Sequence, residues 1–431
     1  MSEVREQHQG GDLMSASMTR AKIPEGGHSG PTVELPERWQ METLGKIAAG
    51  FVSGGTPSTK NNEFWKGNIP WITSKWLNFK LHLESGEKFI SEDALKQSTT
   101  TVVPKNNLIF ATRVGVGKVA VNNLDLAINQ DLAGVLVHSD CHDIRFLAYQ
   151  LRSDRIQRTV VSQKRGATIQ GITRDALKEL EIYLPPLAEQ RKIAGVLCLV
   201  QQAIEQQEKL IALTTELKKT LLHKLFTEGL HGEPQKQTDI GPMPESWNVK
   251  RLDDFCILQR GFDITKKEQI PGNIPVVSSG GIASYHNIAK VKGPGVVVGR
   301  KGTLGTVHYV DMDYWPHDTT LWVKDFKGHD PLFTSYFLKT LRFERYNSGA
   351  SNPTLNRNTV HAELVAYPKP KEQVEIGRIL RTVENKGRLH ERKHVALTAL
   401  FHTMLHQLMT AQVRVDDLDL YTANLTGNRV V

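Results

Sequence analysis

The chain contains one long stretch of sequence twice. Residues 166–227 align without a gap onto residues 349–410, with about 17 of the paired positions identical. The pairing places Arg174 opposite Arg357, and the stretches end in LLHKLFT and MLHQLMT. Because a duplicated stretch forms the same structural unit twice, the sequence predicts two modules of one kind, each ending in a matching segment.

The second part of each copy has the spacing of a coiled coil. Apolar residues recur at alternating intervals of four and three, with polar interruptions near the middle. Prolines precede both stretches, and Glu189 and Glu372 fall in the first turns, where the helix dipole favours acid. We therefore expect two helices of about 40 residues, each about 60 Å long. The simplest arrangement pairs them with each other, antiparallel.

A globular unit precedes each helix. The two units open alike, since Pro36 and Trp39 recur as Pro244 and Trp247. Short apolar β-type runs follow, separated by Gly, Pro and Asn. Amphipathic stretches at residues 144–160 and 331–346 then have the period of a helix. Each unit is predicted to be mixed α and β.

Composition limits the class of protein. With 431 residues, 39% hydrophobic and 23% charged, each half can bury a core. The net charge of +8 favours a polyanionic partner. Cys141, Cys198 and Cys256 lack the spacing of a disulfide framework or a zinc site, and no apolar run reaches 18 residues. We expect a reduced, soluble, cytoplasmic protein.

Catalytic motifs are nearly absent. His390 to His394 spells H-E-x-x-H, the helix of zinc proteases. Both histidines lie on the predicted seam, and the matching stretch of the first copy keeps only the glutamate. Polar seam residues that fix register are the better interpretation, so we predict no metal site. A phosphate-binding loop and a nucleophile elbow are also missing, and the sequence is that of a binding protein.

Glycine-rich turns flanked by basic residues are the candidate binding elements. One spans residues 111–118 and its counterpart spans residues 299–305. Glycine allows close approach of backbone to a ligand, and Arg or Lys can meet phosphate or the guanine edge. Tight hairpins would explain the same glycines. Trp65, Trp71 and Trp76 could stack on bases, although tryptophans in strands more often belong to a core.

Taken in order, these elements resemble the specificity subunit of type I restriction-modification systems. The resemblance rests on the G-G-T-P turn at residues 54–57, the R-x-G-x-G loop from Arg113, Asn129-Gln130-Asp131 and the P-P-L-x-E-Q helix start. It runs from about Leu35 to Gln412. Its implied fold class is α+β, with two mixed α/β target-recognition domains and two long antiparallel helices in a coiled coil.

The resemblance divides the chain into seven parts. They are a disordered extension (1–33), a first target-recognition domain (34–186), a first long helix (187–229), a linker (230–242), a second target-recognition domain (243–370), a second long helix (371–412) and a tail (413–431).

The resemblance implies a noncatalytic reader of a bipartite sequence in double-stranded DNA. The helices would set the spacer and dock two methyltransferase subunits, with or without two restriction subunits. S-adenosylmethionine and ATP with Mg²⁺ would belong to those partners, and this chain would hold no cofactor. The partner-binding helices are the two that carry Ile193, Leu197, Val200, Ile204 and Leu221, and Ile376, Leu380, Val383, Phe401 and Leu408.

Basic and amide side chains in or near the turns are the predicted DNA contacts. They are Lys60, Lys75, Arg113, Lys118, Lys164, Arg165, Gln170, Arg174, Arg260, Lys266, Arg300, Lys301, Asn352 and Arg357.

The second half departs from the first at two of these places. Residues 259–263 replace the G-G-T-P turn, and His317-Asp318 stands where the first half has Asn129-Gln130. Two other functions stay open from the residues alone. One is a duplicated coiled-coil scaffold that binds only proteins, and the other is a zinc hydrolase using the H-E-x-x-H stretch.

Overall fold

The computed structural model describes residues 35–164, 171–346 and 354–418, and these form two compact units. Unit 1 combines the chain up to Gln206 with the chain from His394 onward, and unit 2 runs from Gln207 to Lys393. The long helices α6 (Leu187–Thr227) and α10 (Pro370–Met409) each contribute one part to each unit. Among the helices of the described ranges, none combines the length and apolar character needed to cross a membrane.

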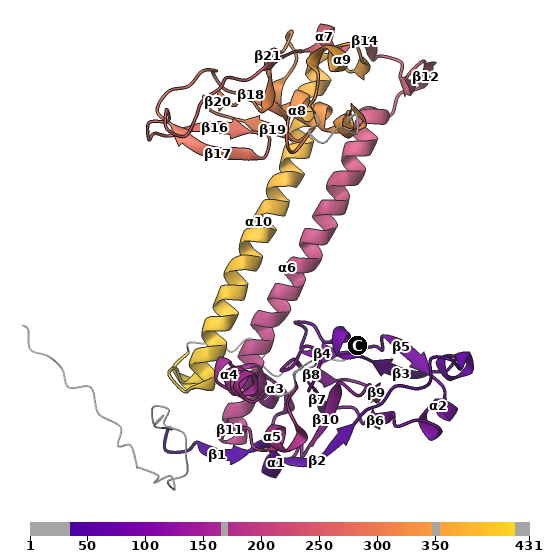
Figure 1. Cartoon of the computed structure of the whole chain (residues 1–431), viewed down its shortest axis with the longest axis vertical. Helices are drawn as coiled ribbons and strands as arrows, with labels where there is room; N and C mark the ends of the chain where they lie inside the picture. The colour runs from indigo at the N-terminus through magenta and orange to yellow at the C-terminus, as the bar shows by residue number, and fades with distance from the viewer. Residues whose placement is uncertain (1–34, 165–170, 347–353, 419–431) are drawn as a thin grey trace, which may run out of the picture. The chain divides into compact units, whose positions relative to one another are not determined.

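Two sheets with a core between them build the globular part of unit 1 (Figure 1). The strand orders are β2-β10-β7-β8-β4 and β5-β3-β9-β6, and β1 pairs separately with β11. The strands are β1 (Gln40–Thr43), β2 (Ala48–Ser53), β3 (Ile69–Ile72), β4 (His82–Leu83), β5 (Lys88–Ile90), β6 (Thr101–Val103), β7 (Asn107–Ala111), β8 (Val119–Asn122), β9 (Leu126–Ile128), β10 (Leu132–Val137) and β11 (Glu181–Leu184).

Strand β7 shows why this arrangement suits the sequence. All five of its residues are buried. Because successive side chains of a strand point to opposite faces, both faces of this strand must be covered. Leu108 and Phe110 join the core that includes α3, while Ile109 and Ala111 join the core between the two sheets. A run that is apolar on both faces therefore folds as a central strand.

Unit 2 repeats the plan, with one strand fewer in each of its two larger sheets. Its main sheet has the order β15-β21-β18-β19, its second sheet the order β17-β16-β20, and β14 pairs with β22. The central strand β18 is again wholly buried. The strands are β14 (Asn248–Arg251), β15 (Ile257–Arg260), β16 (Ile274–Ser278), β17 (Gly281–His286), β18 (Gly295–Gly299), β19 (Val307–Val310), β20 (Trp315–Pro316), β21 (Thr320–Asp325) and β22 (Leu364–Tyr367).

Short helices complete both units. Two of them begin at capping aspartates, because Asp143 accepts hydrogen bonds from the first-turn amides of α3 and Asp330 does so for α8. The remaining bounds are α1 (Leu44–Ile47), η1 (Asn62–Trp65), η2 (Ser74–Trp76), α2 (Glu92–Lys96), α3 (Ile144–Arg152), α4 (Asp154–Ser162), α5 (Arg174–Lys178), α7 (Leu252–Phe255), α8 (Pro331–Thr340), η3 (Phe343–Tyr346), α9 (Arg357–His361) and η4 (Val415–Asp417).

The long helices are joined to their own modules by equivalent glutamines. In unit 1, Gln190 Oε1 accepts a hydrogen bond from the Asp143 amide at 3.0 Å, and its Nε2 donates to the Pro185 carbonyl at 2.9 Å. In unit 2, Gln373 makes the same two contacts, at 3.1 Å with the Asp330 amide and at 2.8 Å with the Pro368 carbonyl. The glutamine of the repeated Glu-Gln pair therefore links the start of each long helix to the N-cap of the short helix α3 or α8.

Inside each unit the two helices pair antiparallel, as predicted. In unit 1 the start of α6, with Ile193 and Leu197, shares a core with Leu408 near the end of α10. In unit 2 the end of α6, with Leu225, shares a core with Ile376 near the start of α10. The predicted mixed α/β class with two long helices is confirmed.

Three stretches differ from expectation. The helix expected over residues 144–160 is interrupted at Ser153, whose extended backbone ends α3 and starts α4. The predicted linker at 230–242 contains β12 (Gln235–Thr238), which pairs with β13 (Gly241–Pro244). The predicted tail begins with an ordered segment, because Arg414 forms two hydrogen bonds of 3.0 Å with the Glu189 carboxylate.

Candidate nucleic-acid interface

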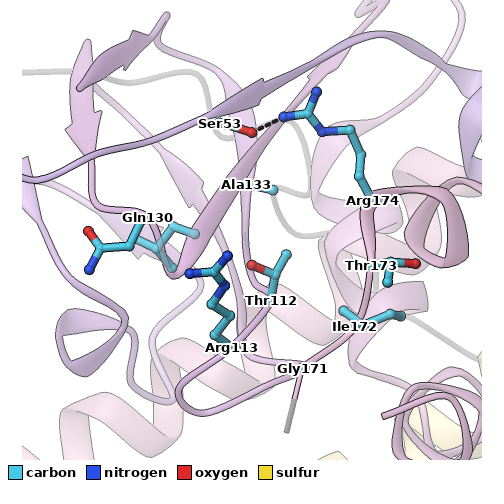
Figure 2. A pocket seen from close by; sticks show the side chains of 10 residues that line it. Ser53, Thr112, Arg113, Gln130, Ala133, Gly171, Ile172, Thr173 and Arg174 are labelled. Atoms are coloured by element: carbon cyan, nitrogen blue, oxygen red, sulfur yellow. Dashed lines mark hydrogen bonds between the residues drawn. The ribbon is translucent and has the colours of Figure 1, made fainter. Parts of the chain in front are cut away.

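Four loops of unit 1 meet around a hollow of about 500 Å³ (Figure 2). Three follow or precede strands of the main sheet, at the ends of β2 and β7 and before β10, and the fourth leads into α5. The predicted contacts Arg113 and Arg174, which are far apart in sequence, both lie here. The lining residues are Ser53, Thr112, Arg113, Gln130, Leu132, Ala133, Gly171, Ile172, Thr173 and Arg174.

Backbone hydrogen bonds hold these loops together. The Asp131 carbonyl accepts from the Thr112 amide at 2.8 Å, and the Thr112 carbonyl accepts from the Ile172 amide at 2.9 Å. Gly54 lies so close to the neighbouring strand that an added Cβ would be 2.1 Å from the Ile128 carbonyl oxygen. The glycine of the G-G-T-P turn is thus required by close backbone approach.

The polar side chains of the hollow offer hydrogen-bond donors to a ligand. The Arg174 guanidinium donates to the Ser53 hydroxyl, and the Thr56 hydroxyl donates to Gln130 Oε1 at 2.5 Å. The Arg113 side chain is exposed beside them (Figure 2). Guanidinium groups and a side-chain amide are the groups that contact phosphates and base edges in protein–DNA complexes.

Unit 2 contains the same backbone frame. The Thr319 carbonyl accepts from the Arg300 amide at 2.8 Å, and the Arg300 carbonyl accepts from the Leu355 amide at 2.9 Å. An added Cβ at Gly261 would be 2.1 Å from the His317 carbonyl oxygen. We call this frame, in either unit, the loop frame.

The loop frame defines which residues of the two units are equivalent. At four of the equivalent positions the two units carry different side chains, and at the fifth both units carry an arginine. The equivalent pairs are Ser53 and Arg260, Thr112 and Arg300, Arg113 and Lys301, Gln130 and Asp318, and Arg174 and Arg357.

In unit 2 these positions are occupied by charged side chains. Arg260 Nη2 lies 3.0 Å from Asp318 Oδ2, and the side chain of Arg260 is 56% exposed while that of Asp318 is 17% exposed. Burial, followed by the nearby charge of Arg260, lowers the pKa of Arg300 below its usual value. The Asp318 carboxylate therefore lies under an exposed guanidinium and close to a second one.

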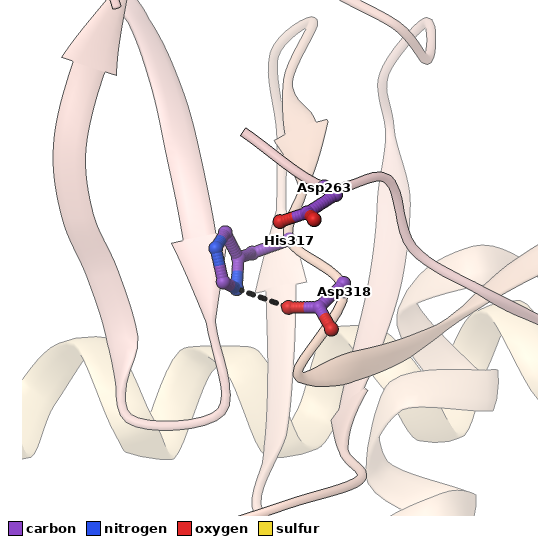
Figure 3. A group of neighbouring side chains, drawn as sticks. All are labelled: Asp263, His317 and Asp318. Atoms are coloured by element: carbon purple, nitrogen blue, oxygen red, sulfur yellow. Dashed lines mark ion pairs between the residues drawn. The ribbon is translucent and has the colours of Figure 1, made fainter. Parts of the chain in front are cut away.

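A possible metal-binding group lies at the same place. Asp263, His317 and Asp318 each offer a ligand atom within 4.8 Å of the others, the single group of this kind in the described part of the chain (Figure 3). Both oxygens of Asp318 are already engaged, one with Arg260 at 3.0 Å and one with His317 Nδ1 at 3.1 Å. Because a cation would have to displace the guanidinium, these residues fit an ion-pair network better than a metal site.

Other predicted contacts lie outside the hollow of unit 1. Lys60 and Lys75 are exposed elsewhere on that unit, and Lys164 follows α4. Lys118 donates from Nζ to the Leu77 carbonyl at 2.9 Å, so its ammonium is used inside the unit. Lys266 is exposed on a loop of unit 2. Arg165, Gln170 and Asn352 lie outside the described residues.

The tryptophans have mainly structural positions. Trp71 is buried and donates to the Gly55 carbonyl at 3.2 Å, and Trp65 packs edge-on against it at 5.1 Å between ring centroids. Trp76 is 37% exposed. The core interpretation is therefore confirmed for Trp71.

The side chains that mark the two predicted partner-binding helices face the seam between those helices. Most of them are buried inside their own units, and the others are partly covered there, because they form the seam between α6 and α10. A partner would have to contact the outward faces of the same helices. The residues concerned are Ile193, Leu197, Val200, Ile204, Leu221, Ile376, Leu380, Val383, Phe401 and Leu408.

The H-E-x-x-H stretch belongs to that seam. His390 Nδ1 lies 2.9 Å from Gln207 Oε1 on the facing helix. The histidines and the glutamate do not form one of the ligand groups found among the described residues. The polar seam interpretation therefore has direct support in the contact between His390 and Gln207.

Comparison with known proteins identifies the family. A family model described as "Type I restriction modification DNA specificity domain" matches residues 36–215 and 244–399, which is most of the chain. The chain belongs to this family. The two matched regions agree with the two copies that the internal repeat predicts.

Curated relatives are type I specificity subunits. The MjaIX subunit of Methanocaldococcus jannaschii is 30% identical over 245 residues, covering 54% of this chain and 55% of that protein. The EcoR124I/EcoR124II subunit of Escherichia coli is 29% identical over 163 residues, covering 37% of this chain and 40% of that protein. The chain thus spans about half the length of the curated relatives it matches.

A solved structure shares the fold. The crystal structure of the type I restriction-modification S subunit from M. genitalium matches 85% of this chain and 95% of its own, with a TM-score of 0.62 and 18% sequence identity. At this identity the likeness concerns the fold.

Sequence reasoning missed the side chains that orient the arginine and amide groups of the interface. Ser53, Thr56 and Asp318 were not among the predicted contacts, although each bonds to a polar group of the interface. The signal that could have found them is the alignment of the two divergent turns, which pairs Ser53 with Arg260 and Gln130 with Asp318.

Proposed function

We propose that the chain is the DNA-reading subunit of a type I restriction-modification complex, with one half-site read by each unit. The observation that carries the proposal is the loop frame, which occurs in both units and presents different polar side chains. A constant frame with variable side chains suits two readers of different sequences. Family membership supplies the biological setting.

The proposal assigns no reaction to this chain. Methylation with S-adenosylmethionine, and translocation or cleavage with ATP and Mg²⁺, would belong to partner subunits. Two modification subunits would dock on outward faces of α6 and α10, and two restriction subunits would join in a restricting system. The helices would also set the spacer between the half-sites.

The test is to co-express the full chain with its cognate modification subunit in a host that lacks adenine methylation. Methylated adenines are then mapped across the genome. The expected result is a split motif with a fixed gap. A matched control carries the modification subunit with a deletion of the chain and should give no motif.

A different outcome of the same experiment would exclude DNA reading by this chain. If the complex assembles but methylates no defined motif, and the chain retains no DNA fragment in a binding assay, DNA reading is excluded. The chain would then act as a scaffold for protein partners.

A further inference from the structure

The loop frame allows a more specific statement about how each unit chooses its bases, and this statement rests on the proposed function. The frame fixes the backbone at equivalent places in the two units. Side chains at equivalent places must therefore face the same part of a bound duplex. Where these side chains differ, the bases that they select should differ.

We propose that Arg260, held by Asp318, reads a guanine in the half-site of unit 2, and that Gln130 at the Asp318 position reads an adenine in the half-site of unit 1. An arginine fork matches the O6 and N7 acceptors of guanine, and a glutamine amide matches N6 and N7 of adenine. Asp318 is a positioning residue in this scheme, and the frame is the common scaffold.

The geometry around Asp318 fits a residue that positions Arg260 and does not itself contact a base. Its side chain is only 17% exposed, and its two oxygens contact Arg260 and His317 at 3.0 and 3.1 Å. The Arg260 guanidinium and the low exposure of the carboxylate together limit the access of a cytosine amino group to it. The Arg260 side chain is 56% exposed and uses one nitrogen for the ion pair. Its other donors remain available for a base edge.

In unit 1 an uncharged neighbour, Thr56, orients the side chain of Gln130. The Thr56 hydroxyl donates to Gln130 Oε1 at 2.5 Å, which fixes the side-chain amide while its Nε2 can still donate. Gln130 is exposed at the edge of the hollow. Each unit thus has one exposed reading group and one neighbour that orients it.

Arg174 and Arg357 have a different role, because they are the same residue at equivalent places in both units. A residue that is constant while the selected bases change suits the phosphate backbone, which carries no sequence information. The proposal therefore separates Arg260 and Gln130, which discriminate, from these two arginines, which hold the duplex.

The experiment is a selection from a randomised double-stranded DNA library with the full chain bound to its modification subunit. Variants are Arg260→Ala, Arg260→Lys, Asp318→Asn and Gln130→Ala. Lys324→Ala, at the far end of β21, is the charge-matched control. Thermal melting of each complex verifies that the variants fold.

The wild-type complex should enrich a bipartite motif with guanine at one position of the unit 2 half-site. Arg260→Ala should reduce the preference for that guanine about 10- to 100-fold and leave the other half-site unchanged. Arg260→Lys should restore overall affinity but not the preference, because the ammonium lacks the planar fork. Gln130→Ala should reduce an adenine preference in the other half-site only.

Asp318→Asn separates positioning from a general structural role. The substitution adds one unit of net positive charge to the interface, so affinity for random DNA should rise while the guanine preference falls. If the carboxylate had only a structural role, Asp318→Asn would lower the affinity for random DNA, the guanine preference and the thermal stability together. An unchanged guanine preference in folded Arg260→Ala, with the motif intact, overturns this inference and leaves the proposed function standing. Failure of the wild-type complex to enrich any motif overturns both.

Discussion

The hydroxyl of Tyr336 donates a hydrogen bond to Glu384 Oε2 at 2.6 Å, and this contact fastens α8 to the long helix α10. Lys218 on α6 binds the other oxygen of the same carboxylate at 2.8 Å. In unit 1 the equivalent contact is neutral, because Tyr149 donates to Gln201 Oε1 at 3.1 Å. One copy therefore carries a charged junction where the other carries an uncharged one.

This junction should make the stability of unit 2 depend on pH. Burial raises the pKa of Glu384, but the hydrogen bonds from Lys218 and Tyr336 outweigh it and bring the pKa from 4.5 down to about 2. A carboxyl with a lowered folded pKa stabilises the fold above its unfolded pKa, and the stabilisation is lost as the pH falls through the folded value. The loss is therefore expected between about pH 4.5 and pH 2.

The corresponding variant is Glu384→Gln, which installs the residue of the other repeat. It should lower the free energy of unfolding at pH 7 by roughly 2–3 kcal/mol and remove this part of the acid dependence. Urea titrations at pH 7 and near pH 3 measure both effects. Glu375→Gln, on an exposed face of α10, is the control. Equal pH dependence of wild type and Glu384→Gln would refute the assignment.

A second prediction concerns the glycines of the loop frame. Gly54→Ala and Gly261→Ala would each place a Cβ 2.1 Å from a backbone carbonyl oxygen, that of Ile128 and that of His317. The backbone has to move to relieve such a contact, so each variant should destabilise its own unit by about 2 kcal/mol or more and weaken recognition of one half-site.

The control for this prediction is Gly50→Ala. Its Cβ would meet only the Leu136 side chain, at 3.7 Å, which is ordinary van der Waals contact. Chemical denaturation and half-site selectivity are measured on all three variants. Similar behaviour of Gly50→Ala and Gly54→Ala would show that close approach at the frame has no special role.

The regular parts of the fold were predictable because local sequence determines them. Strands such as β7 and β18 are wholly apolar runs bounded by turns, and the long helices carry a seam repeated over several turns. The interruption at Ser153 was not predictable, because serine is compatible with a helix interior and its extended backbone here depends on tertiary packing.

The site was predictable only in part, since it depends on contacts between distant residues. Glycine and arginine identified the loops, but the partners of the polar groups lie far along the chain. Arg174 and Ser53 are 121 positions apart, and Arg260 and Asp318 are 58 apart. Local motifs carry no information on such pairs. The repeat provides some of it, once the two units are compared position by position.

A third prediction concerns the constant arginines. Arg174→Ala should weaken DNA binding by a similar factor for all sequences, and it should reduce the slope of log K against log salt by about 0.9 for one lost phosphate contact. Arg357→Ala should do the same in unit 2. Binding titrations at several salt concentrations give the slopes, with Arg158→Ala on the exposed side of α4 as the control. A selective change at one base position, with an unaltered slope, would assign Arg174 to base reading instead.

The last prediction tests whether the long helices set the spacer. Removing residues 207–213 from α6 and 387–393 from α10 deletes one heptad from each, which preserves the seam register and shortens each helix by about 10 Å. His390 and Gln207 are lost together, so neither loses its partner alone. We expect a changed gap in the methylated motif, or loss of methylation, with both half-site sequences unaltered. Deleting seven residues from α6 alone is the control, because it breaks the register and should prevent folding. Full activity on the original gap after the paired deletion would exclude a ruler made by these helices.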